Sequence, residues 1–421
     1  MRRLKPLYHL LIIALLATIP FFAKAAEIMV PPGTGTLTDA VASAVNGDTL
    51  ILQDGGYSGN VVVNKSLTIR PQYRSTQAVV VDTMTIDGVG GIEVTVQGLE
   101  FRKDIVLRRA AAIRILENHW TVNGINAGNY TTSQGVGSLV IIGNRFGSGS
   151  IRNISSDNAY IAGNELLDGW ITISSNASVW IVGNYLRTIR APFISGHPTI
   201  YQSGLGLPVR VIGNRIKCDG EGVNWPRHRC IELHSGLIAN NVIGLSQQIG
   251  SHSSYRFIEL SGSGTVHITN NIIESISSRP DAVLMGRPAR FSGNIITGFQ
   301  GFWRGTIPED FAIDYNLCFN NSWQCSGNGN LDADPLFINR IDYRLKANSP
   351  AIDAGPPDFE LADLDRTRND MGVYGGPWSI DQFDAQRDPQ SLAPYVYPLF
   401  TGRLISGNEL QLRAIGVARF R

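Results

Sequence analysis

The sequence predicts an all-β protein built as a right-handed parallel β-helix, and three observations carry this prediction. A short phrase of apolar residues, a small residue, an asparagine and a further apolar pair recurs along the middle of the chain. Its copies lie 20 to 30 residues apart, a period typical of stacked-coil solenoids. The 45 glycines suit a fold with several bends in each coil. The asparagines of the phrase are Asn144, Asn164, Asn184, Asn214, Asn241, Asn271 and Asn294.

Each copy of the phrase predicts a strand, a tight bend and a second strand. Positions three residues before and two residues after the asparagine are apolar in every copy, as inward-facing strand positions require. The residue just before the asparagine is glycine or asparagine, and both tolerate the positive φ of a tight bend. Stacked coils place like residues about 4.8 Å apart. We therefore expect a ladder of side-chain amides with a structural role, because asparagine at a bend satisfies backbone groups locally.

The two ends of the chain differ from the repeat. Residues 1–25 have a basic start, an apolar run and an Ala23-Lys24-Ala25 cleavage motif, which predicts a signal peptide and an exported protein, periplasmic or extracellular. An uncleaved membrane anchor is the alternative, although the apolar run is short for a span. Residues 36–45 predict an amphipathic helix that plugs the first coil. Gly407-Asn408 predicts the turn of a C-terminal hairpin.

These segments give a division of the chain. Alternating apolar residues at 61–71, 79–88 and 92–101 predict looser early coils, before an imperfect first copy at 113–120. We divide the chain into a signal peptide (1–25), the β-helix with its capping segments (26–377), a linker (378–395) and a small β-hairpin appendage (396–421).

Composition limits the partners. The 36 basic and 35 acidic residues leave a net charge of +1, which argues against bulk electrostatic binding of nucleic acid or an anionic membrane. No segment after the signal peptide is long enough to cross a bilayer, and we expect a monomer. Local disulfides, Cys218–Cys230 and Cys318–Cys325, are the simplest of three connectivities and agree with export. No cysteine–histidine spacing indicates zinc.

Two regions of the chain, one near each end, indicate a known family. Residues 31–71 contain the cap helix, GDTL leading into a strand, a GGY turn and KSLTI as a second strand. The C-terminal phrases are DPLF, DYRL, SPAIDAG and RNDMGVYGG. Together they resemble the pectate-lyase-like superfamily of secreted parallel β-helix repeat proteins, over roughly Val30 to Gly376. The resemblance implies a long, shallow polysaccharide groove along one sheet. It also implies either lyase chemistry with a Lys or Arg base, often with Ca²⁺, or hydrolysis by carboxylates.

Two similar strand segments are the first candidate for chemistry. They are Arg229-Cys-Ile-Glu232-Leu and Arg256-Phe-Ile-Glu259-Leu, about one coil apart. If the isoleucines point inward, Glu232 and Glu259 point outward as stacked neighbours, with His234 beside them. Carboxylates so close need a cation or arginines between them.

The possible roles of this pair follow from its residue types. We predict a calcium site on Glu232 and Glu259, or an acid–base pair with Arg227, His228, Arg229 or Arg256 as base or charge stabiliser. The structural alternative is a surface ladder of Glu–Arg ion pairs. Trp225, in the loop between Cys218 and Cys230, and His234 are expected to contact substrate. No lysine follows Glu232 at the spacing found in calcium-dependent alginate and dermatan lyases, which counts against lyase chemistry.

A second outward column lies four residues before each ladder asparagine. Tyr160 and Trp180 of this column are suited to stacking on sugar rings, and Arg210 and Arg290 to reaching carboxylates. The alternative is an aromatic stack that stabilises the sheet face. Near the C-terminus, the acidic residues from Asp363 to Asp370 are expected mainly to form turns, with calcium as the alternative.

Two functions remain open from the sequence. The first is an exported enzyme, lyase-like or hydrolase-like, that acts on an acidic polysaccharide from the face with Arg227, Glu232, Arg256 and Glu259. The second is a non-catalytic carbohydrate-binding or surface-structural solenoid. Geometry distinguishes them: free carboxylate oxygens facing a cleft favour the enzyme, whereas carboxylates held in arginine pairs favour the second function.

Overall fold

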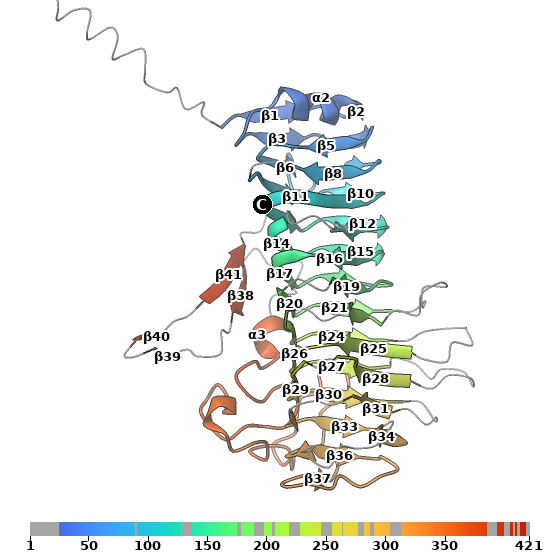
Figure 1. The fold of residues 1–421 in the computed structure, drawn as a ribbon, viewed down its shortest axis with the longest axis vertical. Coiled ribbons are helices and arrows are strands. Elements are labelled where there is room, and N and C mark those ends of the chain that lie inside the picture. Colours follow the sequence, from blue (N-terminus) through green and yellow to red (C-terminus); the bar gives the residue numbers. More distant parts are fainter. Residues whose placement is uncertain are drawn as a thin grey trace, which may run out of the picture.

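The chain winds into a column of stacked coils, with one helix at its N-terminal end and the C-terminal segments folded back along one side (Figure 1). Each full coil contributes one strand to each of three parallel sheets, which confirms the predicted right-handed parallel β-helix. The computed structural model describes residues 25–88, 91–127, 136–174, 178–188, 198–203, 207–218, 228–245, 255–262, 264–276, 282–286, 290–303, 313–384, 394–399, 405–406, 409–410 and 413–417.

The three sheets follow one another in every coil, in the order A, B, C. Sheet A contains β1 (Glu27–Val30), β3 (Thr49–Leu52), β6 (Leu67–Pro71), β9 (Glu93–Gln97), the second half of β11 (Ile105–Leu116), β14 (Val136–Ile142), β17 (Ser156–Ala162), β20 (Ser178–Val182), β23 (Val209–Ile212), β26 (Gly236–Ala239), β29 (Val266–Thr269), β32 (Arg290–Ser292) and β35 (Ile313–Asp314). Sheet B contains β2 (Gly33–Thr34), β4 (Gly55–Ser58), β7 (Ala78–Val80), β10 (Glu100–Phe101), β12 (His119–Val122), β15 (Arg145–Ser148), β18 (Glu165–Leu166), β21 (Tyr185–Arg187), β24 (Arg215–Lys217), β27 (Val242–Gly244), β30 (Ile272–Glu274), β33 (Ile295–Thr297), β36 (Leu317–Phe319) and β37 (Leu331–Asp332). Sheet C contains β5 (Val61–Val63), β8 (Met84–Asp87), the first half of β11, β13 (Ile125–Asn126), β16 (Ile151–Ile154), β19 (Ile171–Ile173), β22 (Ile200–Gln202), β25 (His228–Leu233), β28 (Tyr255–Leu260), β31 (Ala282–Met285) and β34 (Gly301–Trp303).

The asparagine ladder runs along the bend between sheets A and B. Asn184 shows the pattern: its backbone N–H donates to Asn214 Oδ1 at 2.8 Å, and its Nδ2 donates to the same oxygen at 2.9 Å. Asn184 Nδ2 also donates to the Ile161 carbonyl at 2.9 Å, so the amide satisfies buried backbone groups. The ladder therefore has the structural role that we predicted. It extends to Asn316 and Asn330, which lie outside the recurring phrase.

The glycines that precede the ladder asparagines have a second role. Gly163 and Gly213 have φ of 59° and 64°, as the bend predicts. A Cβ on Gly163 would lie 2.0 Å from Tyr397 Oη, and one on Gly213 would lie 2.1 Å from a ring carbon of Phe383. These glycines thus leave room for a C-terminal segment that packs against the bends. We call residues 358–384 and 394–399 of this segment the strap.

The strap replaces part of the predicted linker and appendage with packed structure. Phe383, in α3 (Asp381–Asp384), and Tyr397, in β38 (Tyr395–Leu399), are fully buried against sheet A. The strap also contains the short 3₁₀ helix η1 (Phe359–Leu361). Strand β38 of the strap pairs antiparallel with β41 (Arg413–Val417), and β39 (Ile405–Ser406) pairs with β40 (Glu409–Leu410). The last pair flanks the predicted turn at 407–408, which lies outside the described residues.

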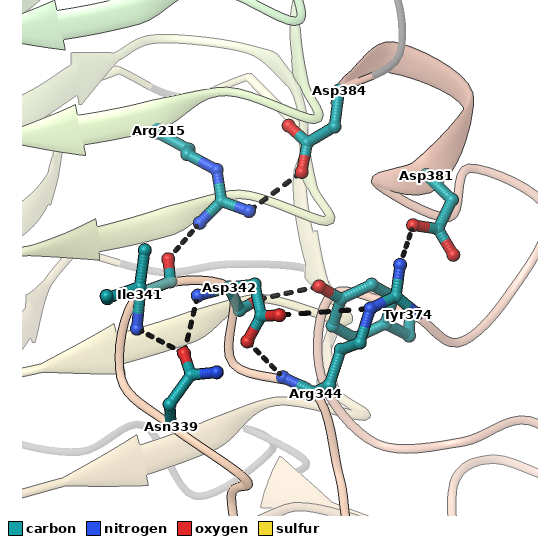
Figure 2. A network of polar contacts seen from close by, with 8 residues as sticks. All are labelled: Arg215, Asn339, Ile341, Asp342, Arg344, Tyr374, Asp381 and Asp384. Atoms are coloured by element: carbon teal, nitrogen blue, oxygen red, sulfur yellow. Dashed lines mark hydrogen bonds and ion pairs between the residues drawn. The ribbon is translucent and has the colours of Figure 1, made fainter.

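Polar contacts fasten the strap to sheet B and to the preceding C-terminal turns (Figure 2). Arg215 of β24 donates through Nη2 to Asp384 Oδ2 at 2.7 Å and through Nη1 to the Ile341 carbonyl at 2.8 Å. Arg344 donates through Nη2 to Asp381 Oδ1 at 2.6 Å. One end of α3 is therefore held by Asp381 and the other by Asp384.

The ends and the disulfides agree with the predictions that the structure tests. Helix α2 (Thr36–Ser43) buries Leu37 and Val41 against the first coils, as a plug should. Both cysteine pairs are local, Cys218–Cys230 and Cys318–Cys325, which is consistent with export. Within the described part of the chain, no helix is long and apolar enough to cross a membrane. The predicted signal peptide falls almost entirely within residues 1–24, outside the described residues, and stays a prediction.

Candidate functional site

Strands β25 and β28 bring the predicted Arg–Glu segments together on sheet C. Their register places Glu232 beside Glu259 and Arg229 beside Arg256. Ile231, between Arg229 and Glu232, is completely buried in the core. Because side chains alternate along a strand, the glutamates point to the outer side, as predicted. We call these four charged residues the Arg–Glu ladder.

Arginines occupy the carboxylates of the ladder. Glu232 accepts a hydrogen bond from Arg229. Glu259 Oε2 lies 3.2 Å from Arg256 Nη1 and 3.4 Å from Arg229 Nε. Glu232, Arg256 and Glu259 are only 6, 6 and 7 % exposed, so two buried carboxylates are compensated by two guanidinium groups. This is the structural alternative that the sequence left open, and it needs no cation.

Calcium binding receives no support from the ladder. Across the residues that the structure describes, no group of three or more histidines, cysteines, aspartates and glutamates is arranged to hold a metal ion. Calcium prefers six or more oxygen ligands. The oxygens of Glu232 and Glu259 named above already face arginine nitrogens.

Three residues complete the surroundings of the ladder. Tyr201 of β22 is in register with Glu232, and burial, followed by the charge of Glu232, raises the pKa of Tyr201. His234 Nε2 lies 3.2 Å from Ser261 Oγ. His234 Nδ1 is buried and has no hydrogen-bond partner among the described residues. His234 therefore lacks the carboxylate that would orient it as a general base for Ser261.

The remaining predicted residues of this face cannot be placed. Trp225 and Arg227 lie outside the described residues, and so does the side chain of His228. Their predicted roles, substrate contact for Trp225 and base or charge stabiliser for the other two, stay predictions.

A cleft of about 430 Å³ lies on sheet A, between the second outward column and the strap. We call it the strap cleft. Sheet A contributes Trp180, Arg210, Leu237, His267 and Arg290 to its lining, and the strap contributes Leu361 and Trp378. The spacing of the second outward column predicted Trp180, Arg210 and Arg290, whereas Trp378 fell in the predicted linker and Leu361 had no predicted role.

Arg210 has no carboxylate partner in this cleft. Its Cζ lies 4.6 Å from the centroid of the Trp180 ring, in a cation–π contact. Burial lowers the pKa of Arg210. No acidic side chain in the described part of the chain lies within ion-pairing distance of Arg210. A partly desolvated cation without a counter-ion is unfavourable by itself, so this end of the cleft is complementary to an anion.

The other end of the cleft is already neutralised. Arg290 forms an ion pair with Asp358 of the strap, and its Nε donates to Ser292 Oγ at 2.9 Å. Next to it, burial and then the charge of Arg290 lower the pKa of His267. His267 is therefore neutral near pH 7 and adds no positive charge there.

Tyr160 is a correction to the predicted binding residues. Its side chain is 3 % exposed and packs against Tyr397 of the strap, with 6.2 Å between ring centroids. The strap therefore covers Tyr160, which cannot stack on a sugar ring. Trp180 and Arg210 do line the cleft, as the prediction of a binding column requires.

Fold and site together define the class of protein: a right-handed parallel β-helix whose C-terminal strap encloses a cleft on one sheet. No protein-family model and no curated protein matches the sequence. The resemblance to the pectate-lyase-like superfamily therefore stays an expectation beyond this fold.

Proposed function

We propose that this protein binds an acidic polysaccharide, and that it does so in the strap cleft. The observation that carries the proposal is the Arg210 guanidinium, stacked on Trp180 and without a carboxylate partner among the described residues. An arginine fork matches the geometry of a carboxylate. Uronate sugars present a carboxylate on a ring, so the carboxylate can pair with Arg210 while the ring packs against the apolar lining of the cleft. The β-helix fold is compatible with proteins that act on polysaccharides.

Binding fits the geometry better than cleavage. A general base must reach the proton that it removes, and a carboxylate locked to a guanidinium is a weaker base. Glu259 faces two arginine nitrogens within 3.4 Å, and Glu232 is paired with Arg229. By the criterion stated above, these pairs favour binding.

The strap-cleft proposal is tested by calorimetric titration of the mature chain. The probes are tetramers of galacturonate and mannuronate, with uncharged xylotetraose as the neutral control. We expect acidic tetramers alone to bind, and Arg210→Met to lose about ten- to a hundred-fold in affinity, the range for a lost charge-assisted hydrogen bond.

The matched control variant is Arg114→Met. Arg114 lies in the same outward column of sheet A, opposite Val140 in the register, but outside the cleft. Its affinity should equal that of wild type. Failure of every acidic tetramer to bind, or equal affinities for Arg210→Met and wild type, would overturn the proposal.

A second candidate function is an enzyme at the Arg–Glu ladder, and one observation favours it. Glu232 and Glu259 are register partners on neighbouring strands whose backbones lie about 5 Å apart. This backbone spacing allows their carboxyl groups to reach the separation of about 5 Å that retaining glycosidases use. The arginines would have to release at least one of the two glutamates for this chemistry.

The enzyme candidate has its own test. A panel of uronate polymers is incubated with wild type and with Glu232→Gln, with and without a chelator. Unsaturated ends, measured by ultraviolet absorbance, report lyase activity, and new reducing ends report hydrolysis. Products with wild type but not with Glu232→Gln would establish the enzyme. Absence of both signals would rule out cleavage of these polymers and leave the binding proposal unaffected.

A further inference from the structure

We propose that Asp358 of the strap occupies the position of a second ligand carboxylate at Arg290. An acidic oligosaccharide that reaches from Arg210 to Arg290 then displaces Asp358. This inference rests on the proposed function, because it assumes that the strap cleft binds acidic sugars. It adds a length requirement for the ligand and a response of the strap.

The register of sheet A places the two arginines at a defined separation. Arg210 pairs with Leu237, Leu237 with His267, and His267 with Arg290. Three strand steps of about 4.8 Å separate the arginine backbones by roughly 14 Å. The sheet positions between them, Leu237 and His267, line the cleft together with Leu361 and Trp378 of the strap. An extended chain of several uronate rings is the class of ligand that presents carboxylates at both ends of this distance and ring faces between.

The two arginines differ in their present partners. Arg210 has none among the described acidic residues, whereas Arg290 is paired with Asp358. The side chains of Arg290 and Asp358 are 37 and 50 % exposed, and ion pairs this exposed contribute little to stability. Exchange of one carboxylate for another at Arg290 therefore costs little, because Asp358 becomes hydrated when released.

The strap is built to respond to this exchange. Asp358 is the residue immediately before η1 (Phe359–Leu361), and Leu361 at the end of η1 lines the cleft. Release of Asp358 removes the ion pair with Arg290, which holds the strap next to Leu361, the η1 residue that lines the cleft. A long ligand should thus loosen η1, whereas a short ligand bound only at Arg210 should leave η1 unchanged.

The experiment measures affinity against ligand length. Galacturonate oligomers from dimer to hexamer are titrated into the mature chain and into Asp358→Asn. We expect Asp358→Asn to raise the affinity for the longest oligomers by about two- to five-fold, the size of an exposed ion pair, and to leave the dimer unchanged. Arg290→Gln should remove the gain in affinity with length.

The matched control is Asp381→Asn. Asp381 is also a strap aspartate in an exposed ion pair, with Arg344, but it lies outside the cleft. Its affinities should equal those of wild type at every length. As a second readout, hexamer but not dimer should speed amide hydrogen exchange at residues 359–362.

The outcomes separate the two proposals. If wild type binds no oligomer, the proposed function and this inference both fail. If wild type binds, but Asp358→Asn has no effect or affects dimer and hexamer equally, only the inference fails. An unchanged exchange rate at residues 359–362 with bound hexamer would also overturn it.

Discussion

Sheets A and C both carry arginines, yet they differ in how the charges of these arginines are balanced. On sheet C, Arg229 and Arg256 have Glu232 and Glu259 as partners within their own two strands. On sheet A, Arg210 has an aromatic ring but no carboxylate among the described residues. A buried charge that pairs with an opposite charge in the same fold needs no ligand. A partly buried charge that is not balanced indicates a ligand.

The strap causes this difference. It packs over part of the outward column of sheet A, including Tyr160, and lines the cleft in which Arg210 is partly desolvated with Leu361 and Trp378. On sheet B, the type of each outward residue also depends on whether the C-terminal segment packs over it. Its outward residues are charged at Arg145 and Glu165, but apolar at Ile272 and Ile295, where the C-terminal segment packs. Arg210 differs from the other arginines beside the C-terminal segment, because Arg215 and Arg290 have aspartate partners there and Arg210 has none among the described residues.

The largest expected effect is on sheet C. Arg256→Met should destabilise the protein by about 3 to 5 kcal/mol, because it leaves the buried Glu259 carboxylate with only the more distant Arg229. Urea unfolding followed by circular dichroism measures this loss. Arg114→Met serves as the control: Arg114 is 45 % exposed, and its replacement should change the free energy of unfolding by less than about 0.5 kcal/mol. Equal stabilities for the two variants would show that the ladder is not the structural element described above.

The second effect is on the strap alone. Phe383→Ala should cost about 3 kcal/mol, because the ring fills the space over Gly183 and Gly213. Hydrogen exchange should then rise in residues 378–384 and 394–399, while β25 and β28 of sheet C keep wild-type protection. Phe359→Ala is the control, since Phe359 belongs to the strap but is 87 % exposed. Equal loss of protection on sheets A and C would mean that the strap and the solenoid unfold as one unit.

Local sequence patterns predicted some features of these two sheets and not others. The coil spacing, the plug helix, both disulfides and the stacking of Glu232 on Glu259 follow from periodicity and neighbouring residues, and all were predictable. The docking of Phe383 and Tyr397 was not, because it joins residues more than 150 positions apart, with no repeat to align them. The glycines at the bends did not indicate this docking, because the positive φ of a bend is by itself a sufficient reason for glycine. Tyr160 was misassigned for the same reason: its exposure depends on a segment that looked like an appendage.

A smaller effect should appear with pH. Asp363 of the strap accepts hydrogen bonds from the Asp370 and Gly376 backbones, but burial, with the charges of Asp370 and Asp365, raises its pKa to about 6. The folded chain then binds this proton more tightly than the unfolded chain, whose aspartate has the ordinary pKa near 3.8. Stability from this group is therefore present below about pH 4 and is lost as the pH rises to about 6.

The pH effect should amount to about 1 kcal/mol after allowance for partial exposure. Thermal unfolding of wild type and Asp363→Asn between pH 4 and 7 measures it, and the difference between their melting temperatures should vary with pH. A constant difference between wild type and Asp363→Asn across this range would contradict the raised pKa.

Of the two sites compared, the strap cleft should show the smaller change in stability, at Arg210, and this change tests the comparison most directly. Arg210→Met removes a partly desolvated charge without orphaning any described carboxylate, and the methionine keeps an apolar contact with Trp180. The free energy of unfolding should change by less than about 1 kcal/mol, in either direction. The same substitution at Arg256 should cost several times more, because Arg256 is only 6 % exposed and is paired with the buried Glu259. If urea unfolding shows a loss of about 3 kcal/mol or more for Arg210→Met, then Arg210 is a structural residue. Sheet A would then be balanced like sheet C, and the case for an anionic ligand in the strap cleft would lose its main support.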